Sequence, residues 1–95
     1  MKNYSTRKWE KKREAILKRD GYKCMECSRK NITTSATMVH HINPADRYPD
    51  LFLVNENLIS LCDECHNKMH DRKHKTLSKL GRKYQQLYYR KIPIR

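Results

Sequence analysis

The sequence predicts a small α+β fold in which a few helices and two short strands form one compact unit. Runs with helical spacing of apolar residues alternate along the chain with short β-branched runs. Only 37% of the 95 residues are hydrophobic. A core of that size rarely holds a fold by itself, so a structural metal or disulfide bonds are expected in addition.

The first helix is expected over residues 5–20. Its apolar side chains, Trp9 among them, share one face at helical spacing. Ser5 or Thr6 can cap its start, and Gly21 lies where the glycine that ends a helix is usually found. Trp9 is interpreted as a core anchor.

Two short strands are expected over residues 37–42, which end in two histidines, and over residues 58–61. The connection over residues 45–57 is long, and long connections inside small domains are often functional. The second strand leads directly into a helix that is expected to run from the last cysteine pair to about Arg72. The tail over residues 72–95 has nine basic and no acidic residues, and helical spacing there predicts a further amphipathic helix that packs on the domain, contacts phosphates, or does both.

Four cysteines form two CxxC pairs separated by 34 residues: Cys24, Cys27, Cys62 and Cys65. Zinc prefers four soft ligands in a tetrahedron, and each pair can supply two of them. Two disulfides, or four thiols unrelated to one another, are the alternatives. No secretory signal is visible at the N-terminus, so a reducing cytoplasmic location is expected, which favours the structural zinc site.

A classical finger is the main rival arrangement of zinc ligands. It would pair Cys24 and Cys27 with His66 and His70. The gap between these pairs is far longer than that finger type uses, and the other two cysteines would have no role, so this arrangement is rejected.

The histidines predict a second metal site. His66 and His70 are four residues apart on the expected helix and would share a face, and His40 lies at the end of the first strand. These three can converge on one cation and leave positions open for water and substrate, as in catalytic metal sites. His41 then remains without a metal, and a neutral imidazole with an ordinary pKa of about 6.5 can take a proton from water.

The net charge of +12 indicates a polyanionic partner, and nucleic acid is the most common one. Contacts to a nucleic-acid backbone are expected from basic residues of the first helix, the long connection and the tail, namely Lys8, Lys12, Arg13, Arg47, Arg72 and Lys73. No segment is apolar enough to cross a membrane. A monomer with weak sequence specificity is expected.

One ordered pattern resembles a known family. It resembles the HNH endonucleases, and most of all their small zinc-knuckle members from phage genomes, over residues 9–72, through His40-His41-Ile42-x-Pro44 followed by Asn57-Leu58-x-x-Leu61-Cys62-x-x-Cys65-His66. The resemblance implies the ββα-metal, or His-Me finger, fold, with two short antiparallel strands and a helix around one metal. It implies a nuclease domain over residues 1–72, followed by a basic C-terminal helix or tail over residues 73–95.

The resemblance also implies residue roles. His41 corresponds to the general base, and Asn57 to the second catalytic motif residue, which holds the long connection and the base. His40 and His66 correspond to metal ligands, the first at a position that many relatives fill with aspartate. His70 corresponds to a third ligand that only some members have, and no role follows for His74.

The activity implied is hydrolysis of DNA with one catalytic divalent ion (Mg²⁺, Mn²⁺, Ni²⁺ or Zn²⁺), leaving 5′-phosphate ends. Two other functions stay open. A non-catalytic zinc module that binds nucleic acid would explain the charge and the cysteines but not the histidines. An accessory nuclease of a larger machine, beside a phage terminase or portal in the cytoplasm of a bacterial host, would fit the phage resemblance.

Overall fold

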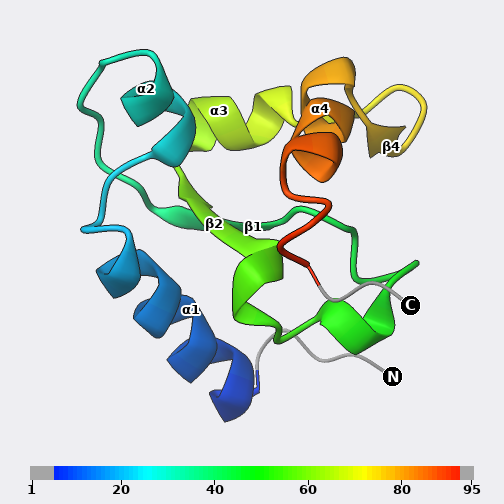
Figure 1. The fold of residues 1–95 in the computed structure, drawn as a ribbon, viewed down its shortest axis with the longest axis horizontal. Helices are drawn as coiled ribbons and strands as arrows, with labels where there is room; N and C mark the ends of the chain where they lie inside the picture. The colour runs from blue at the N-terminus through cyan, green and yellow to red at the C-terminus, as the bar shows by residue number, and fades with distance from the viewer. Residues whose placement is uncertain (1–5, 93–95) are drawn as a thin grey trace.

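The computed structural model describes residues 6–92, which fold around a short antiparallel hairpin (Figure 1). The elements in chain order are α1 (Arg7–Arg19), α2 (Met25–Arg29), β1 (Met38–His41), the 3₁₀ turns η1 (Pro49–Leu51) and η2 (Asn55–Asn57), β2 (Leu58–Leu61), α3 (Asp63–Lys68), β3 (His70–Asp71), β4 (Thr76–Leu77) and α4 (Lys79–Leu87). The expected α+β class and the order of two strands followed by a helix are both present.

The β1–β2 hairpin divides the core into two layers. Successive residues of a strand point to opposite faces, and the register pairs His40 with Ile59 and His41 with Leu58. Helix α1 covers the face that carries Leu58, and α2, α3 and α4 lie on the face that carries Ile59 (Figure 1). Because His40 and His41 are neighbours on β1, the strand directs one toward each layer.

Helix α1 begins and ends close to where the sequence predicts. The Thr6 hydroxyl accepts a hydrogen bond from the backbone N–H of Trp9, so Thr6 is the N-cap, while Ser5 lies outside the described residues. Gly21 follows the C-cap with a φ of 67°, a left-handed conformation that suits glycine. Trp9 is buried in the layer that α1 covers, as the core interpretation requires.

Helix α3 is shorter than predicted and does not reach Arg72. It ends at Lys68, and the chain then forms the β3–β4 hairpin, which the sequence reading missed. The Met69 carbonyl accepts from the Ser78 N–H at 2.8 Å, and the Ser78 hydroxyl donates to the Lys68 carbonyl at 2.5 Å. In a longer helix, the carbonyls of Lys68 and Met69 would instead accept hydrogen bonds from backbone N–H groups one turn further along. The expectation that His66 and His70 share one helix is therefore wrong, because His70 is the first residue of β3.

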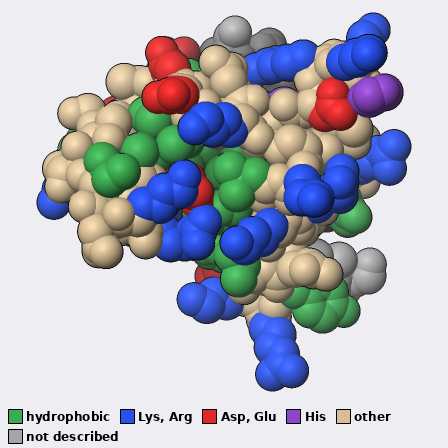
Figure 2. Space-filling view, turned by 90° about the horizontal axis from the view of Figure 1, so that it is seen from above, with side chains coloured by type: hydrophobic (Ala, Val, Ile, Leu, Met, Phe, Trp, Pro, Cys, Tyr) green, Lys and Arg blue, Asp and Glu red, His purple; other side chains and the backbone are tan. Residues whose placement is uncertain are grey.

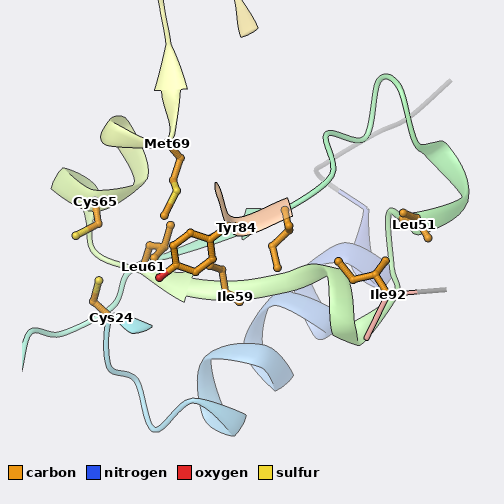
Figure 3. Close-up of a cluster of buried hydrophobic side chains, with 9 residues drawn as sticks. Cys24, Leu51, Ile59, Leu61, Cys65, Met69, Tyr84 and Ile92 are labelled. Carbon is orange, nitrogen blue, oxygen red and sulfur yellow. The ribbon is translucent and has the colours of Figure 1, made fainter. Parts of the chain in front are cut away.

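Helix α4 packs against the layer that contains the cysteines. Its Tyr84 ring lies among Leu61, Ile59 and Met69 (Figure 3). The helix approaches Met69 closely through Gly81, where an added Cβ would lie 2.4 Å from the Met69 carbonyl oxygen. Gly81, which weakened the prediction of a helix in the tail, is thus the residue that lets α4 dock. Over the described residues, no helix is both long and apolar enough to cross a bilayer.

Candidate active site

The four cysteines form one cluster at the junction of α2, β2 and α3. Their sulfur atoms all lie within 4.8 Å of one another, and Cys27 Sγ and Cys65 Sγ are 3.6 Å apart. A disulfide requires about 2.05 Å between sulfurs, so these are free thiols in a shared cluster. Cys24 and Cys62 are the N-caps of α2 and α3, which places the two knuckles face to face.

The chemistry of this cluster matches a bound cation. Burial is the largest effect on two of the thiols and raises the pKa of Cys24 and of Cys65, whereas a hydrogen bond with Thr34 lowers the pKa of Cys27. A cation stabilises the thiolate form of all its ligands, so it would favour ionisation of the two buried thiols as well. The donor set, four sulfurs and no water position, is that of a structural zinc site.

A second cluster is formed by three histidines from different elements. His40 comes from β1, His66 from α3 and His70 from β3, and one ring nitrogen from each lies within 4.8 Å of the others. Their rings meet edge to face, with centroids 5.0 to 5.5 Å apart. The structure therefore brings together the three predicted ligands, although through a hairpin rather than through one helix.

His40 provides the test of whether these residues suit a metal. Its Nε2 is buried and has no hydrogen-bond partner, the one such side-chain atom among residues 6–92. Burial, aided by the nearby histidines, lowers the pKa of His40 to about 3, so the ring is neutral. A buried nitrogen lone pair without a donor is costly, and a cation shared with His66 and His70 would satisfy it.

His41 lies beside this cluster but makes different contacts. Its ring stacks on Trp9 and Phe52, with centroids 4.9 and 5.1 Å away. Its Nε2 is 3.1 Å from the Phe52 carbonyl oxygen. A carbonyl can only accept, so Nε2 carries the proton and Nδ1 keeps the lone pair of the neutral ring. Burial lowers the pKa of His41 although the Phe52 carbonyl opposes this, so the ring is neutral at pH 7.

A cavity of about 200 Å³ joins the two parts of the site. His40, His41, His66 and His70 all line it, together with residues of the segment that follows β1. The base candidate and the ligand candidates therefore face one space, although His41 leaves the strand toward the other layer. This arrangement is what attack on a metal-bound phosphate would require.

The side chain of Asn57 fixes the conformation of the long connection between β1 and β2. Its Oδ1 accepts from the backbone and side-chain nitrogens of Asn43, at 2.8 and 3.1 Å, and its Nδ2 donates to the carbonyls of Asn43 and Leu51. Leu51 precedes Phe52, whose carbonyl orients His41. Asn57 does not contact His41 directly, so it can act on the base only through the connection.

The predicted DNA-contacting residues are divided between two regions. Within α1, Lys12 donates to Asn55 and Arg13 donates to the Thr37 carbonyl, so both side chains help attach the helix to the hairpin. Arg47 and Arg72 line one cavity beside His70. Lys8 and Lys73 are exposed.

The sequence reading missed several parts of the site. The Phe52 carbonyl and the Trp9 ring have no signal in residue type that links them to His41. Asn43 is buried and pairs with Asn57, and its place beside Pro44 in the histidine motif was a usable signal. Gln85 of α4 donates to Asn43 at 3.0 Å, and nothing in the local sequence points to that contact.

A ββα unit with a thiol cluster behind it and a histidine cluster at its surface defines a nuclease of the His-Me finger class. The family model for the HNH endonuclease matches residues 24–72. A crystal structure of the HNH endonuclease from deep-sea thermophilic bacteriophage GVE2, solved with a manganese ion, is similar with 39% identity and a TM-score of 0.66, covering 75% of this chain and 73% of that one. The chain belongs to the HNH endonuclease family and is an endonuclease that hydrolyses phosphodiester bonds. No curated protein matches it significantly.

Proposed function

We propose that this endonuclease depends on a divalent metal and cuts DNA at the histidine site. The observation that carries the proposal is the orphaned Nε2 of His40, a residue that forms a cluster with His66 and His70. His40, His66 and His70 would hold the ion, whose chemistry there is to neutralise charge on the phosphate and on the leaving oxygen. The manganese ion of the similar phage enzyme supports a divalent metal.

His41 is the proposed general base. Its Nδ1 lone pair takes a proton from a water molecule as the water oxygen bonds to phosphorus. The bond from phosphorus to the 3′ oxygen breaks, and that oxygen is protonated from solvent, which leaves 3′-hydroxyl and 5′-phosphate ends. Trp9, Phe52 and the Phe52 carbonyl hold the imidazole in this orientation and tautomer.

The other assignments support the same activity. Asn57 positions His41 through the connection, and Cys24, Cys27, Cys62 and Cys65 hold a structural Zn²⁺ that performs no chemistry. The proposed nuclease domain covers residues 1–72, and residues 73–95 form a proposed basic C-terminal element, of which α4 packs on the domain. Contacts to the DNA backbone come from the six basic residues predicted for this role, namely Lys8, Lys12, Arg13, Arg47, Arg72 and Lys73.

The proposed setting is a phage genome-packaging machine. The similar enzyme comes from a phage, and on that basis we propose an accessory nuclease that acts beside a terminase or portal during DNA packaging, as a monomer. The free thiols suit the reducing cytoplasm of a bacterial host. Pull-down of the chain with those packaging proteins tests this setting, and cleavage in their absence would still be expected.

A plasmid-nicking assay tests the catalytic roles. The wild type should nick DNA when Mg²⁺, Mn²⁺, Ni²⁺ or Zn²⁺ is added and should stop when the metal is removed. His41→Ala should lower the rate by about 10²–10⁴-fold, the usual contribution of a general base, while circular dichroism and DNA binding stay unchanged. His74→Ala is the matched control, because His74 is exposed and outside the cluster. Full activity of His41→Ala would refute the role of the base.

A further inference from the structure

The cavity at the histidine site continues into two larger hollows along α4. The first, about 680 Å³, shares Pro44, Asp46 and His70 with the histidine cavity. The second, about 1030 Å³, shares Tyr48, Arg82 and Gln85 with the first. Because they share lining residues, the three spaces are adjacent, and together they extend from the histidines past the β3–β4 hairpin to α4. We call the two larger hollows together the α4 groove.

The charge of the α4 groove is strongly basic. Six basic side chains line it against the carboxylates of Asp46 and Asp71, and Asp71 is already paired with His74 at 2.9 Å. The basic side chains are Arg47, Arg72, Lys75, Lys79, Arg82 and Lys83. Across the face seen in Figure 2, Lys and Arg side chains far outnumber acidic ones.

Four of the six basic residues of the groove are also available to a ligand. Within residues 6–92, the side chains of Arg47, Lys75, Lys79 and Lys83 make no hydrogen bond or ion pair. Arg72 donates to Asn67, and Arg82 donates to the Leu77 carbonyl. In α1, by contrast, Lys12 and Arg13 are bound to the hairpin and its connection. Free exposed cations along a groove suit a chain of phosphates better than cations already used to hold the fold.

A hydrogen-bonded chain of three side-chain amides links the wall of the α4 groove to the connection between β1 and β2. Gln85 on α4 donates to Asn43, and Asn43 donates to Asn57 at 3.1 Å. Asn43 and Asn57 are both buried. Buried amide chains of this kind are rigid when every member is paired, so the α4 groove keeps a fixed position relative to the histidine site.

We infer that the α4 groove binds the DNA strand being cut, by its phosphates, on one side of the scissile phosphate. The inference rests on the proposed function, because it takes the histidine site as the place of cleavage. The inference also gives the path of the bound DNA strand, which leaves the histidine site along the β3–β4 hairpin and α4. Most of the basic residues involved lie beyond residue 72, where the match to the family model ends.

The experiment compares two double variants with equal loss of charge. Lys75→Gln with Lys83→Gln removes one free cation from each hollow. Lys11→Gln with Lys18→Gln removes two exposed lysines seven residues apart on α1, on the helix face opposite Trp9. Binding of a labelled 20-base-pair duplex is measured by anisotropy over a series of salt concentrations, with full-length protein and no added divalent metal.

The slope of log affinity against log salt should fall by about two for the groove variant, since each phosphate contact contributes about 0.9. The α1 variant should keep the wild-type slope. Equal changes in both variants, or an unchanged slope in the groove variant, would overturn the inference, as would a wild type that does not bind DNA. Nicking by the wild type separates the two proposals. Slopes as expected without nicking leave the groove standing and remove the catalytic roles, whereas nicking with unchanged slopes removes the groove alone.

Discussion

Asn57 is a buried side chain whose four hydrogen bonds close the connection between β1 and β2. Its partners are the backbone N–H, the side-chain amide and the carbonyl of Asn43, and the carbonyl of Leu51. If the side chain were removed, each of these groups that water does not reach would be left unpaired, at a cost of about 1–3 kcal/mol. The position of the Phe52 carbonyl, and with it that of His41, depends on this closure.

Asn57→Ala should therefore reduce the free energy of unfolding by about 2–4 kcal/mol and also slow DNA cleavage. Urea denaturation and initial nicking rates are the measurements. Asn55→Ala is the control, because Asn55 makes its side-chain bond with Lys12 at the exposed surface. If Asn57→Ala unfolds like the wild type, the connection is held by other contacts and Asn57 has no positioning role.

At the scale of elements, α4 docks through a close approach that only glycine permits. A Cβ at Gly81 would meet the backbone oxygen of Met69 at 2.4 Å, and backbone cannot move aside as a side-chain end can. Alanine has the higher helix propensity by about 1 kcal/mol, so propensity and packing oppose each other here.

Packing should prevail, and Gly81→Ala should destabilise the fold by about 1–3 kcal/mol, as overpacking does. The thermal midpoint and the near-ultraviolet signal of the buried Tyr84 report the change. Gln86→Ala, on the exposed side of the same helix, should leave both unchanged or raise the midpoint slightly. A stabilised Gly81→Ala variant would mean that α4 does not dock as described.

The attachment of α1 to β2 depends on a carboxylate. Asp20 Oδ2 accepts from the Ser60 N–H at 3.0 Å, and the Asp20 side chain is only 7% exposed. Burial by itself would raise the pKa of Asp20, but hydrogen bonds from Arg19 and Ser60 outweigh it and lower the pKa. The folded state therefore favours the ionised form.

The sign of the pH dependence follows from this lowered pKa. Asp20 stabilises the fold fully above the unfolded pKa of about 3.9 and loses that contribution as the pH falls through the lower folded value. Asp20→Asn should thus be less stable than the wild type at pH 6, and the difference should shrink below about pH 4. Urea midpoints of both proteins from pH 6 to pH 2.5 provide the test, and a constant difference would exclude this role.

For the whole molecule, the proposed zinc joins two parts of the chain that are separated by 34 residues in sequence. The cysteine cluster connects α2 to the junction of β2 and α3, and its members Cys24 and Cys65 belong to the core layer in Figure 3. In a 95-residue chain with 37% hydrophobic residues, binding free energy at such a site becomes folding free energy.

Prolonged chelation should therefore unfold the protein or lower its melting temperature by well over 10 °C, and Zn²⁺ alone should restore it. Circular dichroism follows the fold during both steps. His66→Ala keeps the cysteines and should respond to the chelator in the same way, which separates the structural ion from the catalytic one. A chelated protein that melts like the starting material would show that the thiols need no metal.

The sequence by itself determined the two donor sets and the hairpin. The CxxC spacing and the motif His40-His41 are local features, and ligand chemistry restricts what such residues can do together. The β1 and β2 runs are equally local, and the structure placed both strands within one residue of their predicted bounds.

Only the tertiary structure decided how these parts meet. The Ser78 hydroxyl bonds to the Lys68 carbonyl where α3 ends and the chain enters β3. His70 therefore lies near His40 as part of a hairpin rather than as part of α3. The Phe52 carbonyl selects the tautomer of His41, and Gln85 ties α4 to Asn43 across 42 residues of sequence. These outcomes depend on backbone groups and on contacts between residues far apart in the sequence, and neither can be predicted from residue type and spacing.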